Sequence, residues 1–142
     1  MRAVVDTNLL ISGALWAGPP ARLLDAIRAG RLQPVQSPEL WAEFVEVLHR
    51  PKFAARLRLV GLTPTQLTEA WRRHVTWIPN ATISIPPGLR DPKDLMVLAA
   101  AVAGKVEAVV TGDAHLLALN SFKEIPILTV RQALEKLGVA AE

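Results

Sequence analysis

The sequence has no cysteine and no tyrosine, and it contains only three histidines among its 142 residues. Without cysteine, the chain can form neither a disulfide nor a thiolate-bound zinc site. The histidines, His49, His74 and His115, also lack the close helical spacing of a histidine zinc motif. Any metal ion is therefore expected to be held by oxygen atoms.

Long apolar runs are missing as well. No stretch free of charge and proline reaches the roughly 18 residues that a membrane span needs. The opening residues reach Asp6 too early to contain the apolar core of a secretion signal. Hydrophobic residues make up 51% of the chain and charged residues 20%, which excludes a disordered protein. We expect a single globular domain over residues 1–142, located in the cytoplasm and without membrane partners.

Apolar patterns and turn residues predict strands that alternate with helices. The expected strands cover residues 2–6, 32–36, 75–78, 107–111 and 125–129, and the expected helices cover 19–29, 38–50, 52–60, 64–74, 92–103, 114–119 and 130–138. A proline-rich loop is expected at 79–90. This alternation predicts an α/β fold, namely a three-layer α/β/α domain with a mainly parallel sheet.

Four acidic residues lie at the end of a strand, near the start of a helix or within a helix. Asp6 closes the first strand, Asp113 follows a valine-rich strand, Asp94 lies near a helix start, and Glu43 lies within the 38–50 helix. Open α/β sheets bind ligands at the carboxyl ends of their strands. Carboxylates gathered there would repel one another unless they bound protons or a hard cation. The pattern therefore predicts a Mg²⁺ or Mn²⁺ site.

Each acid also has a simpler structural explanation. Asp6 can cap a helix, Asp113 can form a strand-to-helix turn, and Asp94 can be an acidic residue in the first turn of a helix capped by Asp91. Glu43 can belong to a solvated helix flank. Capping, however, explains only one of the three polar residues that begin at Asp6, and spacing alone does not separate the two roles of Asp94.

The order of the four acids carries a family resemblance. The segments concerned are Asp6-Thr7-Asn8, the helix around Glu43, Arg90-Asp91-Pro92-Lys93-Asp94 and Val110-Thr111-Gly112-Asp113. Together they resemble the PIN-domain ribonucleases, and specifically the prokaryotic branch identified as toxins of toxin–antitoxin pairs. The resemblance extends from residue 1 to about residue 133.

This resemblance implies a function and a set of roles. Asp6, Asp94 and Asp113 would be direct ligands of Mg²⁺ or Mn²⁺, and Glu43 would hold a second ion or its water. Asn8 and Thr111 match polar positions that support the site. The ions would activate water to cut RNA. The resemblance further implies a small antitoxin partner and a homodimer.

Two positions depart from the family pattern. Relatives often have Asp or Asn directly after the Asp94 position, where this chain has Leu95, so Asp94 or Asp91 must suffice as the third acid. Relatives also tend to have an acid near position 115. His115 stands there, and we expect it to lie on the surface rather than at the margin of the site.

Basic residues could hold the RNA backbone. The sequence pI of 9.8 indicates a basic surface, which is compatible with a nucleic-acid partner. Candidate contacts lie along one helical stretch and its entry: Arg50, Lys52, Arg56 and Arg58, with Arg72 and Arg73 on the next helix. An ordinary solvated helix face explains these residues equally well.

Two other functions compete with the metal-dependent ribonuclease. In a phosphatase with Asp6 as covalent nucleophile, a second Asp normally lies two residues later, where this chain has Asn8. Such enzymes also need a later basic motif that the sequence does not show. The other alternative is a binding module that keeps the nuclease fold but has little turnover, and Leu95 leaves this alternative open.

Overall fold

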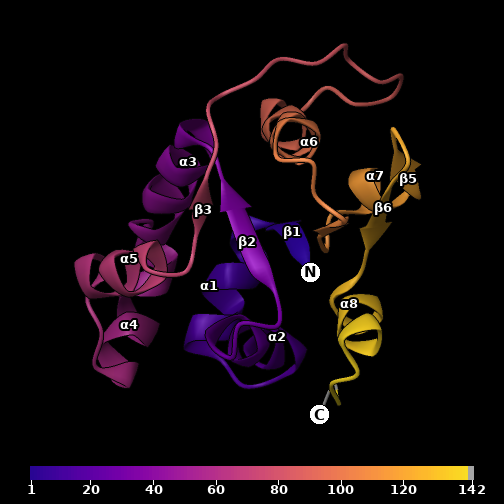
Figure 1. Cartoon of the computed structure of the whole chain (residues 1–142). Helices are drawn as coiled ribbons and strands as arrows, with labels where there is room; N and C mark the ends of the chain where they lie inside the picture. The colour runs from indigo at the N-terminus through magenta and orange to yellow at the C-terminus, as the bar shows by residue number, and fades with distance from the viewer. Residues whose placement is uncertain (141–142) are drawn as a thin grey trace.

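Helices cover both faces of a six-stranded sheet in the computed structural model, which describes residues 1–140 (Figure 1). The strands are β1 (Arg2–Val5), β2 (Gln33–Gln36), β3 (Thr76–Trp77), β4 (Ala108–Val110), β5 (Ser121–Phe122) and β6 (Ile125–Leu128). Their order is β3-β2-β1-β4-β6-β5, and only the β5–β6 pair is antiparallel. The predicted α/β fold with a mainly parallel sheet is confirmed.

The helices form two outer layers. They are α1 (Thr7–Leu15), α2 (Pro19–Arg28), α3 (Pro38–Leu48), α4 (Ala54–Val60), α5 (Pro64–Arg72), α6 (Pro92–Ala103), α7 (Ala114–Leu117) and α8 (Val130–Leu137), with a 3₁₀ turn at Pro51–Phe53. Val5 and Val110 belong to the core cluster that contains residues of α1, α2, α3 and α8. Val4 and Val109 belong to the cluster of α6 and α7 on the opposite face. Successive strand residues therefore face opposite layers, as the pleat requires.

Prolines and caps set the helix boundaries as the sequence predicts. α2, α3, α5 and α6 each begin with proline, which needs no hydrogen-bond acceptor at that position. The Ser37 hydroxyl accepts a hydrogen bond from the Leu40 amide at 3.3 Å and caps α3. Gly13 lets α1 and α2 approach closely, because a Cβ atom there would lie 2.5 Å from the carbonyl oxygen of Pro20.

Some expectations about local structure were wrong. The expected single helix at 52–60 is divided into the 3₁₀ turn and α4, because Pro51 starts the 3₁₀ turn. The strand β5 was not expected; it is a two-residue edge strand that pairs only with β6. Helix α1 was considered only as the alternative in which Asp6 is a cap, and it is present. Several helices end one or two residues before their expected ends.

The carboxyl ends of β1 and β4 bring the first site residues together. The Asp6 amide donates to the Val110 carbonyl at 2.9 Å, and the Thr111 amide donates to the Leu128 carbonyl at 3.0 Å. These bonds extend the parallel ladder one residue beyond β1 and β4. The side chains of Asp6 and Thr111 therefore emerge side by side at one edge of the sheet.

Two further expectations, a single domain and the lack of a membrane span, concern the whole chain. Within residues 1–140, no helix has the length and apolar character to cross a bilayer. Residues 141 and 142 of the expected 1–142 domain lie outside the described part of the chain. The single-domain assignment stays a prediction.

Candidate metal centre

Asp6 is both a helix cap and part of a buried polar network. One carboxylate oxygen, Oδ1, accepts from the Asn8 amide at 3.3 Å, and the other, Oδ2, accepts from the Thr111 hydroxyl at 2.7 Å. Asp6 is only 3% exposed and Thr111 is fully buried. The hydroxyl of Thr111 thus helps to fix the rotamer of Asp6, whereas its supporting role in a metal site stays a prediction. Asn8 is exposed and lines the cleft beside the acids.

Asp113 is held at the start of α7 by the same network. The Asp113 amide donates to the Thr111 hydroxyl at 3.0 Å. Its Oδ1 accepts from the amides of His115 and Leu116 at 2.8 and 3.0 Å. Asp113 is therefore a cap, as the structural alternative predicted, and its second carboxylate oxygen has no assigned role in capping. A metal-binding role for this second oxygen stays a prediction.

The structure separates Asp94 from Asp91. Asp91 is exposed, and its side chain caps α6 by accepting from the Lys93 amide at 2.9 Å. Asp94, three residues later, is only 2% exposed, and one of its carboxylate oxygens lies within 4.8 Å of a carboxylate oxygen of Asp113. Burial, and then repulsion from Asp113, Asp91 and Asp6, raises the pKa of Asp94 to about 6. Asp94 is thus the acid of this segment that lies within the cluster.

Glu43 joins the cluster through two residues that the sequence did not single out as site residues. The Thr7 hydroxyl donates to Glu43 Oε2 at 2.5 Å. The Lys93 ammonium lies 3.8 Å from Glu43 Oε1 and 3.2 Å from Asp6 Oδ1. Burial lowers the pKa of Lys93, but the charges of Asp6 and Glu43 outweigh this effect and raise it. Glu43 therefore does not lie on a solvated flank with its neighbours.

An open cleft of about 500 Å³ lies over this edge of the sheet. Its lining includes Asp6, Asn8, Ser12, Lys93, Gly112, Asp113 and His115. Apart from its chain neighbours, no described residue has an atom within 4 Å of a Cβ atom built on Gly112. The space beside Gly112 belongs to the cleft, so an incoming ligand could use it.

His115 lies at the margin of the site although its side chain is 78% exposed. We expected a surface position, and the exposure agrees with that expectation. The ring nevertheless lies near the acids: potential ligand atoms of His115, Asp94 and Asp113 all fall within 4.8 Å of one another. His115 lies near the acids because it comes two residues after Asp113, the residue that caps the short helix α7.

The comparison with protein families agrees with this geometry. The family model described as "PIN domain" matches residues 2–115, which include all four acids. The chain belongs to the PIN-domain family. No curated protein matches the chain. PIN domains are typically metal-dependent nucleases, and the acidic cluster of this PIN domain could bind a metal ion.

The residues of this PIN domain fit a divalent cation. Among the residues that the structure describes, the buried oxygen Oδ1 of Asp94 has no hydrogen-bond partner. A buried carboxylate oxygen without a partner is costly, and a cation would remove this cost. Carboxylate oxygens suit Mg²⁺ and Mn²⁺, while the imidazole of His115 suits Mn²⁺ better than Mg²⁺. Asp94, Asp113 and His115 could thus hold one ion.

The predicted RNA-binding residues lie at a distance from the acids. The Arg56 side chain donates to the carbonyl of Leu15 at 2.7 Å, and its guanidinium lies 5.3 Å from the centre of the Trp16 ring. Leu15 ends α1, whereas Asp6 caps its start, so about 13 Å of helix separates the two. Arg50 pairs with Glu46 at the surface. The structure does not bring this stretch into the cleft.

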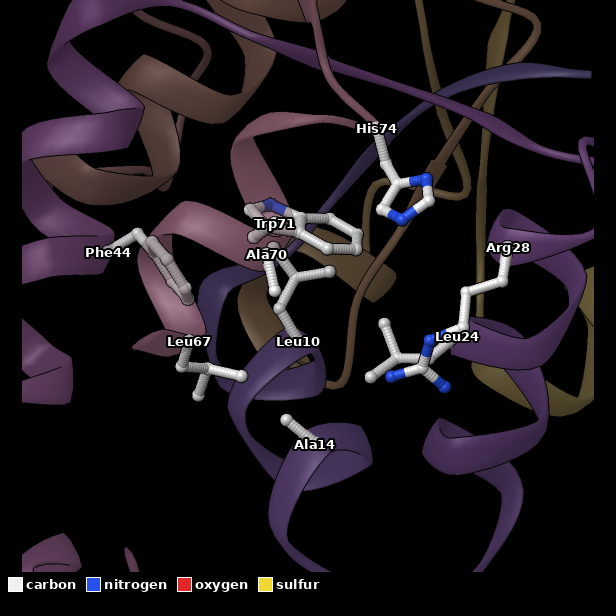
Figure 2. Close-up of a pocket in the computed structure, with 9 residues that line it drawn as sticks. All are labelled: Leu10, Ala14, Leu24, Arg28, Phe44, Leu67, Ala70, Trp71 and His74. Atoms are coloured by element: carbon white, nitrogen blue, oxygen red, sulfur yellow. The ribbon is translucent and has the colours of Figure 1, made fainter. Parts of the chain in front are cut away.

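A second cavity in this PIN domain is apolar (Figure 2). It lies between α1, α2, α3 and α5 and is lined by Leu10, Ala14, Leu24, Arg28, Phe44, Leu67, Ala70, Trp71 and His74. Its volume is about 50 Å³, which is far too small for a nucleotide. None of the acids lines it. This cavity is therefore not a candidate active site.

Proposed function

We propose that this PIN domain is a Mg²⁺- or Mn²⁺-dependent endoribonuclease. The observation that carries the proposal is the buried Asp94: among the described residues its Oδ1 has no hydrogen-bond partner, and it offers a ligand atom within 4.8 Å of ligand atoms of Asp113 and His115. Acids serving only as caps would be satisfied by backbone amides, as Asp91 is. A cleft of about 500 Å³ adjoins Asp6 and Asp113, and the space beside Gly112 is open to an incoming phosphodiester strand.

The site residues have separate roles in this proposal. Asp94 and Asp113 would hold the ion, together with His115 at the margin. The negative charges of Asp6 and Glu43 would strengthen the attraction of the site for a cation. A bound divalent cation would supply positive charge that acidifies water and stabilises charge on the phosphodiester. Thr111 orients Asp6, and Thr7 orients Glu43. Asn8 is exposed in the cleft, where its amide could contact the substrate.

The first prediction concerns the requirement for metal. Purified protein is expected to cut a single-stranded RNA of mixed sequence in the presence of Mn²⁺ or Mg²⁺ and to lose this activity with excess chelator. Cleavage of an end-labelled RNA, resolved on a denaturing gel, measures the rate. Re-addition of Mn²⁺ should restore activity, which controls for irreversible damage by the chelator.

Three outcomes distinguish the competing functions. Cleavage at the same rate with and without chelator would contradict the metal requirement. RNA binding without cleavage in any divalent ion would favour the binding module instead. Release of phosphate from a phosphomonoester, together with a covalent phosphoenzyme lost in Asp6→Asn, would favour the phosphatase.

The second prediction concerns the RNA-binding residues Lys52 and Arg58, both of which are exposed. A strand bound in the cleft could continue along α1 to these residues. Replacing both by Ala should weaken RNA binding equally for all sequences and reduce the salt dependence by about one unit of slope per lost contact. Arg56 is left intact because it supports the end of α1.

Filter binding at several salt concentrations, in an Asp113→Asn background that prevents cleavage, provides the measurement. Arg131→Ala, on the exposed surface of α8, is the control for loss of basic charge. If the double variant has the same salt slope as the Arg131→Ala control, Lys52 and Arg58 belong to an ordinary solvated surface.

The biological role that we propose is that of the toxin in a toxin–antitoxin pair. The resemblance of the four acidic segments supports it. A small antitoxin protein and a second copy of the chain are the proposed partners, and the exposed Leu59 and Val60 on α4 would suit such an interface. Arrest of cell growth on expression, relieved by Asp113→Asn, tests the role.

A further inference from the structure

A basic residue lies among the acids of the candidate site. The ammonium of Lys93 approaches two carboxylates from different parts of the chain, at 3.2 Å from Asp6 and 3.8 Å from Glu43. The Lys93 side chain is only 24% exposed. Lys93 lies in the first turn of α6, and its backbone amide donates a hydrogen bond to the capping side chain of Asp91.

Lys93 divides the acidic cluster into two halves. Asp6 and Glu43 form the half that contacts the ammonium. Asp94 and Asp113 form the other half, which could take a metal ion together with His115. Within residues 1–140, Asp94 forms no salt bridge, and its Oδ1 has no hydrogen-bond donor. One half thus already has a cation, and the other half lacks one.

We propose that Lys93 is a built-in cation that occupies the place of a second metal ion between Asp6 and Glu43. A divalent ion a few ångströms from an ammonium would be strongly repelled, so the two cannot share this half of the site. The chain therefore binds one ion, at Asp94, Asp113 and His115. A second ion could bind only after Lys93 withdraws into the cleft, which its side chain lines.

The proposal explains how the carboxylates of Asp6 and Glu43 can both lie close to one point of the site. Two carboxylates in a partly buried site repel each other, and a positive charge between them offsets this repulsion. The proposal deepens the proposed function and depends on it only for the choice of Mn²⁺ as probe. Its test measures binding and stability, neither of which requires RNA cleavage.

The third prediction compares Mn²⁺ binding by wild type and Lys93→Met, using isothermal titration calorimetry. Methionine keeps the length and apolar stem of lysine but removes its charge. We expect one Mn²⁺ per chain for wild type. For Lys93→Met we expect a second equivalent of Mn²⁺, or a first equivalent that binds at least ~10-fold more tightly. Lys93→Arg and the surface control Lys136→Met should behave as wild type.

Thermal melts of the same proteins provide a second readout. Without metal, Lys93→Met should melt about 3 °C or more below wild type, because Asp6 and Glu43 lose their cation. Mn²⁺ should then raise its melting temperature by more than it raises that of wild type. A merely structural role for Lys93 would lower the melting temperature without this additional gain from Mn²⁺.

The outcomes are separable from those of the cleavage assay. A folded Lys93→Met variant with wild-type Mn²⁺ stoichiometry and affinity would overturn the proposal. If the variant does not fold without metal, Mn²⁺ should restore its circular dichroism spectrum, and failure to do so would also overturn the proposal. An absence of cleavage by wild type, with the binding results as expected, would contradict only the nuclease function.

Discussion

Replacing Asp113 or Asp6 by Asn is expected to reduce the rate of RNA cleavage at least ~100-fold, the scale seen when charge stabilisation of a transition state is removed. The substitution removes the charge of the side chain but keeps its ability to cap a helix. Both acids cap helices, and Asn caps about as well as Asp. The variants should therefore keep their fold while the negative charge of the site is lost.

Single-turnover cleavage in saturating Mn²⁺ measures this effect, with melting curves to confirm the fold. Asp25→Asn is the matched control, because Asp25 is an exposed acid on α2 that pairs with Arg22 and Arg28 at the surface. It should cleave at the wild-type rate. If Asp113→Asn and Asp6→Asn both retain full activity, these acids are caps alone and the proposed site is wrong.

The architecture was predictable because local signals and the fold agree. Valine-rich segments predicted the buried strands β1 and β4, and a proline after a capping residue predicted the starts of α3 and α6. The carboxyl-edge position of Asp6 and Asp113 follows directly from those elements. The edge strand β5 was missed because two residues carry no periodic signal, and the 3₁₀ turn was missed because Pro51 suits either helix type.

The roles within the site were less predictable, because they depend on contacts between distant segments. Capping and metal binding were treated as competing explanations for Asp6 and Asp113, whereas the geometry is compatible with both. Glu43 had the same spacing as its solvated neighbours, and only the contacts with Thr7 and Lys93 distinguish it. Lys93 gave no signal, since a lysine within an acidic motif usually reaches solvent.

The stability of the metal-free protein should depend on Asp94. The folded state raises its pKa from the ordinary 3.8 to about 6, so between these values the folded chain binds more protons than the unfolded chain. Stability contributed by this group is therefore present at low pH and is lost as the pH rises through about 6. The difference between a pKa of 3.8 and one of about 6 corresponds to a loss of about 3 kcal/mol of stability at neutral pH.

Asp94→Asn removes this loss, because the amide stays neutral at every pH. At pH 7.5 without metal, the variant should melt roughly 5 to 10 °C above wild type, and the difference should shrink toward pH 4. Added Mn²⁺ should raise the melting temperature of wild type more than that of the variant, which has lost one of its two carboxylate ligands. Differential scanning calorimetry across pH, with and without Mn²⁺, gives both comparisons.

Asp91→Asn provides the control for this experiment and also decides which acid of the segment binds metal. Asp91 is exposed and caps α6, a role that Asn also fills, so the variant should melt close to wild type and keep its response to Mn²⁺. If Asp94→Asn instead melts below wild type at pH 7.5, the Asp94 carboxylate stabilises α6 as an ordinary first-turn acid. If Asp91→Asn loses the Mn²⁺ response and Asp94→Asn keeps it, Asp91 is the ligand, and the buried oxygen of Asp94 has a different cause.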